Sequence, residues 1–405
     1  MTLTLPASDN KVQYMVGQSD SMTCVRPLVP YDELACEFLN SLSAALLSDK
    51  EAKLYPDVIS FAYWCRKANI AKLKREFMGK HIRLGLGIVF HITPSNMPIN
   101  FAFSYAFSLL AGNANIVRVP TKDFPQTSIV CRVINRLFAT ENFKKIVDMT
   151  VFVRYQQNDE ITGIFSENCN ARFIWGGDKA INNIRKLTIP ERSMEITFAD
   201  RYSFCAIDGN SIMQADNVTM GRLASSFYND TYLMDQNACS SPHLVVWLGV
   251  DDVLIKAKQR FWNSVYEMVA SKYELQPVNS VDKYMLICEN AIGLKNITSF
   301  KKYGNYLYRT ELGSLPYNMD VFRGKCGYFY EYDTDDINSV THIINKKYQT
   351  LTYFGVEKSE LLDFVVNNRL SGIDRIVPIG SALDIGVIWD GYDIVKSLSR
   401  VVEVK

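Results

Sequence analysis

The stretch LGLGIVFHITPSNMPINFAFSYAFSLLAGNANIVRVP, residues 84–120, decides the fold. Its opening run, 84–92, is apolar and β-branched and predicts a buried strand. TPSN at 93–96 has the composition of a turn, and the apolar run 99–111 that follows predicts a helix. NIVRV at 115–119 predicts the next strand. A strand–helix–strand unit of this kind places its two strands in parallel.

The alternation of strand and helix continues to about residue 187. Helices are expected over 125–140 and 178–187, and strands over 149–155 and 170–177. The residues before 84 are expected to be mainly helical. The predicted fold class is therefore α/β, with a parallel sheet covered by helices and joined by right-handed crossovers.

A change in composition near residues 208–216 predicts a domain boundary. Beyond it we expect a second α/β unit, with a long helix at 251–273, a strand at 284–288 (YMLIC) and a helix at 335–347. The predicted parts of the chain are a first domain with N-terminal helices, a second domain, and a C-terminal segment that returns to the first domain or to a partner subunit: residues 1–215, 216–375 and 376–405.

Composition excludes several classes of protein. The chain of 405 residues carries 44 lysines and arginines against 43 aspartates and glutamates, a formal net charge of +1. This balance argues against binding nucleic acid or an acidic membrane through bulk charge. No apolar run has the length of a membrane span, and no signal peptide is recognisable. Nine scattered cysteines and four histidines without ligand spacing predict reduced thiols, a cytoplasmic location and no bound metal.

Two turns are candidates for a ligand site, because parallel α/β sheets bind ligands where strands end and helices begin. They are HITPSNMP at 91–98 and IWGGDKAIN at 174–182. Free N–H groups of a helix start would line the first turn. Paired glycines in the second let the backbone approach a bulky group such as a diphosphate, although a plain tight turn would use the same glycines. The fingerprint G-x-G-x-x-G is absent.

Cys239 is the candidate nucleophile. It lies in the polar loop DTYLMDQNACSSP at 230–242, whereas the other cysteines lie in helix or strand patterns or beside apolar residues. Its small, hydrophilic neighbours indicate access for a substrate. The side-chain amide of Asn96 could stabilise an oxyanion if the two residues meet.

Two histidines invite a Cys–His pairing. His91 closes an apolar strand, which favours a hydrogen-bonded core histidine. His243 lies four residues beyond Cys239, and both a structural position and a place in the active-site lining stay open for it. A Cys–His hydrolase would also need an orienting third group, and none is evident.

Three stretches resemble the LuxC-type fatty acyl-CoA reductases of the luciferase pathway, a family within the aldehyde dehydrogenase superfamily. They begin with GIVFHITPSNMP at Gly87, continue with DQNACSSP at 235–242, and end with GIDRIVPIGSALDIGVIWDGYDIVKSLSR at 372–400. The similarity spans residues 80–405 in consistent order. It implies a modified Rossmann cofactor domain, an α/β catalytic domain and an oligomerisation segment.

The resemblance also implies roles for individual residues. Cys239 corresponds to the acylated nucleophile and Asn96 to the asparagine of the oxyanion hole. Thr93, Pro94 and Ser95 correspond to the backbone beside the nicotinamide.

Further cofactor-binding positions follow from the same resemblance. Arg118 stands in the place of the lysine that holds the adenosine ribose, and Gly176 and Gly177 in the turn under the diphosphate. Arg118 and Lys122 together could neutralise a 2′-phosphate, so NADPH is expected in preference to NADH.

Two motifs of aldehyde dehydrogenases are altered. The pattern L-E-L-G-G-K reads MEITFA at 194–199, so Glu195 matches the glutamate that activates water in hydrolysing members, but the glycines after it are missing. The E-x-F-G-P motif is absent, and FRGKCG at 322–327 stands roughly in its place without an assigned function.

The resemblance thus implies an NADPH-dependent long-chain acyl-CoA reductase that forms a fatty aldehyde through an acyl-enzyme on Cys239. The implied partners are an acyl-CoA or acyl-carrier substrate, an acyl-activating enzyme and further copies of the chain in a homo-oligomer. Three alternatives stay open. They are an acylating aldehyde dehydrogenase for a short or functionalised acyl group in surface-polysaccharide or natural-product synthesis, an acyl transferase or thioesterase without hydride transfer, and a non-catalytic subunit of an acyl-activating complex.

Overall fold

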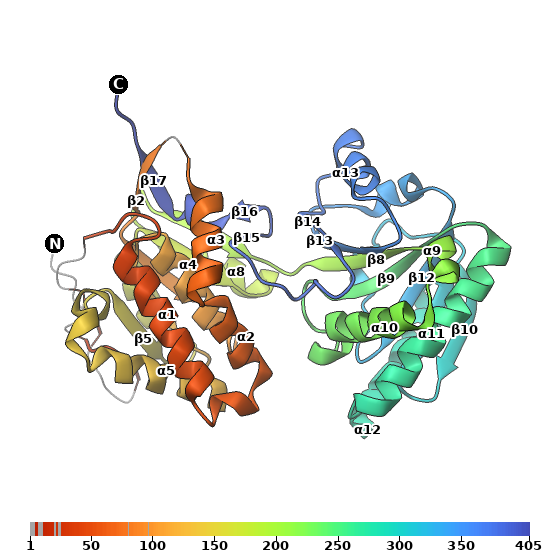
Figure 1. Ribbon diagram of the computed structural model, residues 1–405, viewed down its shortest axis with the longest axis horizontal. Coiled ribbons are helices and arrows are strands. Elements are labelled where there is room, and N and C mark those ends of the chain that lie inside the picture. Colours follow the sequence, from red (N-terminus) through yellow and green to blue (C-terminus); the bar gives the residue numbers. More distant parts are fainter. Residues whose placement is uncertain (1–4, 7–10, 20–21, 23–25, 80, 96) are drawn as a thin grey trace. The chain divides into compact units, whose positions relative to one another are not determined.

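The computed structural model of this chain describes residues 5–6, 11–19, 22, 26–79, 81–95 and 97–405. The chain divides into two compact units, each built around a sheet with helices against it (Figure 1). Unit 1 comprises Met1–Ala199 and Tyr392–Lys405, and unit 2 comprises Asp200–Gly391.

The sheet of unit 1 has six strands in the order β1-β5-β4-β3-β6-β7. β1 is antiparallel to β5, and all other neighbours are parallel. The parallel strands therefore have the Rossmann-type order 3-2-1-4-5, which reverses between β3 and β6. The strands are β1 (Gln13–Val16), β3 (Ile88–Ile92), β4 (Ala114–Arg118), β5 (Thr150–Arg154), β6 (Ala171–Trp175) and β7 (Met194–Phe198).

The helix α4 (Asn100–Leu110) is buried along its whole length. Its apolar residues extend around the helix, and it packs on β3 and β4 with α1 (Glu33–Ser48) against it. The other elements of unit 1 are η1 (Ala52–Leu54), α2 (Pro56–Trp64), α3 (Lys67–Phe77), β2 (Ile82–Gly85), α5 (Pro125–Phe138), η2 (Glu141–Phe143), α6 (Lys144–Val147), α7 (Asp159–Glu167), α8 (Asp178–Ile184), β16 (Tyr392–Asp393), α14 (Ile394–Ser397) and β17 (Ser399–Val402).

The expected strand 84–92 is divided into β2 and β3. Gly87 has φ of +131°, a backbone conformation that glycine adopts without strain, and the side chain of Asn113 accepts the N–H groups of Leu86 and Gly87. β3 then enters the six-stranded sheet, whereas β2 pairs with β17.

Unit 2 contains a seven-stranded sheet in the order β10-β11-β12-β9-β8-β13-β14, parallel except for the edge strand β10. Alternate residues of β8 enter two separate apolar cores, one on each face of the sheet. The strands are β8 (Tyr202–Asp208), β9 (Pro242–Leu248), β10 (Ile297–Tyr303), β11 (Leu307–Leu312), β12 (Tyr328–Thr334), β13 (Tyr348–Phe354), β14 (Arg375–Pro378) and the short β15 (Ile388–Trp389).

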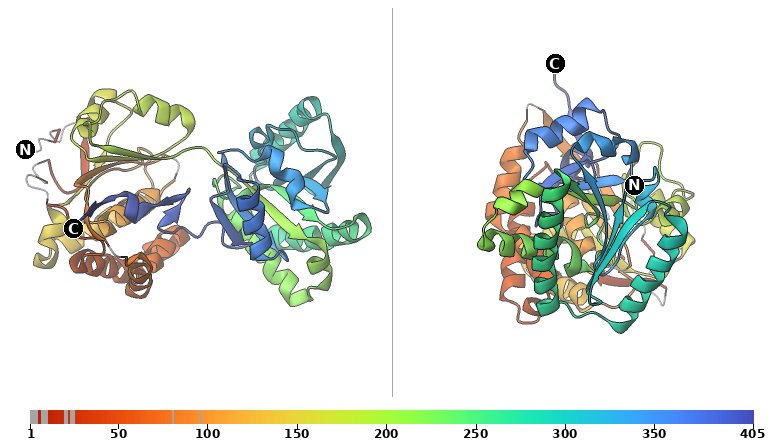
Figure 2. Two further views of the ribbon diagram at one scale, coloured as in Figure 1. Left: turned by 90° about the horizontal axis from the view of Figure 1, so that it is seen from above. Right: turned by 90° about the vertical axis from the view of Figure 1, so that its right-hand side faces the viewer.

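Helices cover both faces of this sheet. α11 packs into one core and α12 against the other, and the two lie on opposite sides of the sheet in Figure 2. The helices of unit 2 are α9 (Gly209–Gln214), α10 (Asn217–Thr231), η3 (Tyr232–Met234), α11 (Asp251–Lys272), α12 (Pro277–Gly293), η4 (Met319–Val321), η5 (Ile337–Ile343) and α13 (Lys358–Asn367).

Two expected elements of unit 2 were wrong in type. The segment 284–288 is not a strand but the middle of α12, which starts at Pro277 and turns Leu286 and Ile287 toward the core. Its apolar run is short, and such runs do not distinguish a strand from a helix. The helix expected at 335–347 is only the 3₁₀ helix η5.

The division of the chain also differs from the expected one. β8 pairs with β9 and β13, so the chain enters unit 2 at Asp200 and not at residue 216. Residues 376–391 remain in unit 2, and the return to unit 1 begins at Tyr392. That return ends in β17, which pairs with β2 in an antiparallel, two-stranded sheet.

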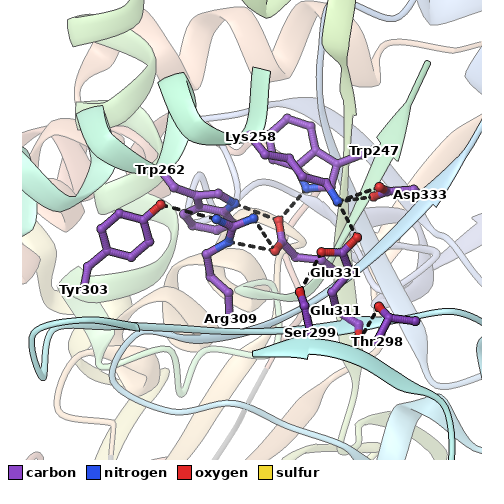
Figure 3. A network of polar contacts seen from close by, with 10 residues as sticks. All are labelled: Trp247, Lys258, Trp262, Thr298, Ser299, Tyr303, Arg309, Glu311, Glu331 and Asp333. Atoms are coloured by element: carbon purple, nitrogen blue, oxygen red, sulfur yellow. Dashed lines mark hydrogen bonds and ion pairs between the residues drawn. The ribbon is translucent and has the colours of Figure 1, made fainter. Parts of the chain in front are cut away.

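A buried network of charges lies in one core of unit 2 (Figure 3). The guanidinium of Arg309 contacts the carboxylate of Glu331 at 2.6 Å, and each side chain is at most 3% exposed. The indole N–H groups of Trp247 and Trp262 both donate to the second oxygen of Glu331 at 2.7 Å. Every oxygen of this buried carboxylate is therefore hydrogen-bonded, as burial of a charge requires.

Candidate active site

The carboxyl edge of the sheet in unit 1 brings together the segments expected to hold a dinucleotide. Residues 93–95 follow β3, Arg118 ends β4, and Gly176–Gly177 follow β6. β3 is hydrogen-bonded to both β4 and β6, so the three segments are neighbours where the strand order reverses. Open α/β sheets bind ligands at this point.

The segment after β3 is fixed at its start. Thr93 is buried, and its hydroxyl donates to the carbonyl of Arg118 at 2.7 Å, which joins the ends of β3 and β4. Pro94 is half-buried and Ser95 is exposed. Asn96, the expected oxyanion donor, lies outside the described residues.

Two cations stand at the end of β4. The guanidinium of Arg118 lies 4.4 Å from the ring centroid of Tyr155 and donates to the Tyr155 carbonyl at 3.3 Å. The ammonium of Lys122 lies 5.1 Å from the ring centroid of Phe124, and its side chain is exposed. Arginine and lysine at a sheet edge are suited to phosphate groups.

The glycine turn after β6 leaves space beside the backbone. A Cβ atom on Gly177 would meet no atom within 4 Å, and one on Gly176 would meet only the Cβ of Ala180, at 3.6 Å. Gly177 has φ of −69°, which any residue adopts. The fold itself does not require glycine here, so the pair suits the close approach of another molecule. This edge fits a dinucleotide, with cations after β4 and an open backbone after β6.

His91 is a hydrogen-bonded core residue, as the sequence predicted. Its Nδ1 lies 2.7 Å from the Ser104 hydroxyl and its Nε2 lies 3.0 Å from Oδ1 of Asn115. Trp175 donates to the same Ser104 hydroxyl at 3.1 Å. Burial lowers the pKa of His91 to about 3, and the hydrogen bond to Asn115 opposes this only in part. His91 is therefore neutral in the folded protein at physiological pH.

The burial of His91 predicts acid sensitivity. The unfolded chain protonates this imidazole below about pH 6.5, whereas the folded chain does so only near pH 3. Its contribution to stability is therefore complete above pH 6.5 and is lost as the pH falls toward 3. A His91→Gln variant is expected to show a flatter decline of unfolding free energy over this range, measured by urea unfolding at successive pH values. An identical slope in both proteins would contradict the assignment.

Glu195 occupies a different environment from the one its motif implied. It is the second residue of β7 and pairs in register with Arg172 of β6, three residues before the carboxyl edge. Arg172 and Arg185 each contact one of its carboxylate oxygens, both at 2.6 Å. Both oxygens are thus engaged, which favours a structural ion pair over a base that activates water.

Cys239 lies in unit 2, just before the amino end of β9. The cofactor segments of unit 1 instead follow the carboxyl ends of their strands. The side chain of Cys239 is exposed. The backbone N–H of Arg201 lowers the pKa of its thiol. Within the described part of the chain, the backbone N–H of Cys239 itself has no acceptor, so this donor is available to a ligand.

Hydrogen bonds hold the loop that carries Cys239. The hydroxyl of Ser203 donates to the Cys239 carbonyl at 2.7 Å. The buried side chain of Gln236 donates to the carbonyls of Pro242 and Tyr328, both at 3.0 Å, and its oxygen accepts the N–H of Gly327 at 3.2 Å. These bonds stabilise Gln236 in a left-handed conformation, with φ of 60°.

Burial and charges of both signs act on the pKa of Cys239. Its thiol is accessible to solvent but is densely surrounded by protein atoms, and this desolvation raises its pKa. The Arg201 N–H and the Arg323 guanidinium lower the pKa, whereas the carboxylates of Asp390 and Asp200 raise it. The net effect favours the protonated thiol, so the acylation step needs a means of stabilising the thiolate.

His243 does not provide a base of ordinary strength. It is 4% exposed, and its ring lies 5.3 Å from that of Tyr202. Burial, with the charge of Arg323, lowers its pKa to about 3. A neutral imidazole of such low basicity is poorly suited to deprotonate a thiol near neutral pH.

Sequence reasoning did not identify the neighbours of Cys239. Ser203, the second residue of β8, donates to the Cys239 carbonyl, and Arg201 and Arg323 act on its thiol from segments distant in sequence. Two positions in the sequence could have indicated them. Gln236 belongs to the motif DQNACSSP, and Arg323 belongs to the stretch FRGKCG that replaces E-x-F-G-P.

Other features of the described residues limit the chemistry. No three His, Cys, Asp or Glu side chains among them are grouped as metal ligands. No helix in the described ranges combines the length and the apolar character that crossing a membrane requires. The eight described cysteines are all free thiols.

Several aldehyde dehydrogenases of known structure are similar in fold to this chain. An NAD-dependent aldehyde dehydrogenase from Sinorhizobium meliloti matches with a TM-score of 0.65 at 11% identity, covering 91% of this chain and 81% of that chain. Lactaldehyde dehydrogenase from Escherichia coli matches with a TM-score of 0.60 at 13% identity, covering 92% and 86%. Aldehyde dehydrogenase 21 from Physcomitrella patens, in complex with the product succinate, matches with a TM-score of 0.63 at 11% identity, covering 99% of this chain and 97% of that chain. The expected fold class is confirmed.

The family follows from the sequence. The profile of acyl-CoA reductase (LuxC) matches residues 64–282, more than half of the chain. This protein belongs to the LuxC acyl-CoA reductase family. No curated protein matches it by sequence. Family and fold together define an oxidoreductase of acyl or aldehyde groups.

Proposed function

We propose that this protein reduces a long-chain acyl thioester, carried by coenzyme A or an acyl carrier, to an aldehyde with NADPH. The observation that carries the proposal is the environment of Cys239 in a member of this family. The cysteine is exposed, its loop is fixed by Ser203 and Gln236, and its own N–H is free to bind an oxyanion.

The chain's residues have defined tasks in this reaction. The Cys239 sulfur attacks the thioester carbonyl, and the Cys239 N–H holds the resulting oxyanion. The Asn96 amide is the second donor that the family resemblance implies. One such donor contributes roughly 10²–10³ in rate. The C–S bond to the leaving thiol then breaks, that thiol takes a proton, and the acyl group remains on Cys239. NADPH, when bound, would supply the hydride for reduction of this acyl group, and the Cys239 thiolate would be restored as the aldehyde leaves.

The state of Glu195 supports reduction over hydrolysis. Water that attacked the acyl-enzyme would waste the substrate as a free acid. Because Arg172 and Arg185 occupy both oxygens of Glu195, this carboxylate does not assist such water.

The cofactor preference depends on the cations after β4. Arg118 and Lys122 would hold the 2′-phosphate, and Gly176 and Gly177 would lie under the diphosphate. Replacing both cations, as Arg118→Ala with Lys122→Ala, is expected to raise KM for NADPH at least about tenfold while changing KM for NADH much less. Initial rates with each cofactor measure this. Arg132→Gln is the matched control. This arginine lies on α5 and is already paired with Asp49 and Glu51. A wild-type preference for NADH would contradict the prediction.

The reaction is tested directly with acyl-CoA substrates of graded chain length. Purified protein and NADPH are expected to yield aldehyde in proportion to NADPH consumed, with the highest rates for long chains. Thioester cleavage without NADPH consumption would indicate a transferase or thioesterase instead. A preference for short or functionalised acyl groups would indicate the biosynthetic alternative. Mass measurement of the native protein, alone and with candidate acyl-activating enzymes, tests the proposed homo-oligomer and partner.

A further inference from the structure

Four consecutive residues at the start of unit 2 connect Cys239 to a single cation. Asp200 accepts from Nη1 of Arg323 at 2.7 Å. The backbone N–H of Arg201 lowers the pKa of the Cys239 thiol. The ring of Tyr202 lies 5.9 Å from the guanidinium carbon of Arg323, and Ser203 donates to the Cys239 carbonyl. This segment therefore contacts both Arg323 and the loop that carries the nucleophile.

Among the described residues, Arg323 is the charged side chain that lowers the pKa of Cys239. The carboxylates of Asp200 and Asp390 raise it. The guanidinium of Arg201 is engaged by Asp374 and by the carbonyl of Tyr348.

The remaining neighbours do not change this. Lys325, in the same turn as Arg323, acts on His243, and His243 is buried and neutral. Arg323 also donates to the carbonyl of Asp320 at 3.3 Å, so its position is fixed from two sides.

We propose that Arg323 is a positioning residue that stabilises the Cys239 thiolate, with Asp200 and Tyr202 holding its guanidinium in place. The proposal deepens the proposed function, because it rests on Cys239 as the nucleophile. It also gives a role to the FRGKCG stretch that replaces E-x-F-G-P. In this chain that stretch supplies a cation to the cysteine.

The test measures the reactivity of the thiol without any acyl substrate. Full-length protein is alkylated with iodoacetamide between pH 6 and 10, and modification of Cys239 is followed by peptide mass spectrometry. Cys288, an exposed cysteine on α12, serves as the reference thiol within each sample. The variants are Arg323→Gln, Arg323→Lys as the charge-conserving rescue, and Asp200→Asn, which keeps the oxygen that accepts from Arg323.

Arg323→Gln is expected to slow alkylation of Cys239 at pH 7.5 at least about threefold and to displace its pH profile upward, while Cys288 is unchanged. Arg323→Lys should restore most of the rate. Asp200→Asn should increase the rate, because it removes an opposing charge. Both substitutions weaken the same ion pair, so a general loosening of the loop would change the alkylation rate in the same direction in both variants. Opposite changes exclude that explanation.

Three outcomes would overturn the proposal. They are an unchanged profile in Arg323→Gln, an equal loss in Arg323→Lys, and slower alkylation in Asp200→Asn. Failure of the proposed function is a separate result. A protein that shows the expected alkylation profiles but forms no aldehyde from acyl-CoA would refute acyl reduction and leave the role of Arg323 intact.

Discussion

A Cys239→Ser protein is expected to form no aldehyde and to retain no label from a radiolabelled acyl-CoA. The serine hydroxyl is a much weaker nucleophile than a thiolate and no base of suitable strength lies beside it, so aldehyde formation should fall at least about a thousandfold. Label remaining on denatured protein after gel filtration measures the acyl-enzyme, and NADPH consumption measures turnover.

Cys288→Ser is the matched control. This cysteine is also exposed in unit 2 but lies on α12, away from the loop before β9. It should keep wild-type labelling and turnover. Stoichiometric label on Cys239→Ser, or its loss in Cys288→Ser, would place the acyl group on another residue.

Glu331→Gln is expected to destabilise unit 2 by about 3–5 kcal/mol. The substitution leaves the charge of Arg309 buried at 2% exposure without its counter-ion and turns an amide group toward the guanidinium. This is a large share of the roughly 5–15 kcal/mol that stabilises a folded domain. Urea unfolding followed by tryptophan emission and circular dichroism measures the loss.

A double variant separates the unpaired charge from other effects of the change. Arg309→Met with Glu331→Gln removes both charges and still leaves an oxygen to accept the indole N–H groups of Trp247 and Trp262. It should be more stable than Glu331→Gln alone, because burying an unpaired charge costs more than replacing the whole pair. Equal destabilisation in both variants would show that the buried charge is not the cause.

The sequence predicted the parts of the fold that depend on local pattern. The run from 84 to 120 indicated parallel strands joined by a buried helix, and β3, α4 and β4 form that unit. It did not indicate that β2 would pair with β17, about 315 residues further along the chain, because such pairing depends on tertiary structure. The segment 284–288 was mistaken for a strand, since a short apolar run has no period of its own.

Part of the candidate site could likewise be predicted from local sequence, and part depends on the tertiary structure. The turns that follow β3 and β6 could be predicted, because parallel sheets bind ligands at their carboxyl edge, and Arg118 at the end of β4 was implied by the family resemblance. The surroundings of Cys239 could not, since Ser203 of β8 and Arg323, both distant in sequence, act on it only once the chain is folded. Glu195 was carried over from a motif, and only its register opposite Arg172 reveals that its oxygens are already occupied.

Trp175 gives the protein an optical reporter. Its indole stacks on Phe198 with ring centroids 3.8 Å apart, directly before the glycine pair after β6. Indole emission overlaps the absorbance of a reduced nicotinamide, so a dinucleotide seated there should quench this fluorophore by energy transfer. A titration of emission, with Trp175→Phe to subtract the other tryptophans, would follow cofactor occupancy in the absence of turnover.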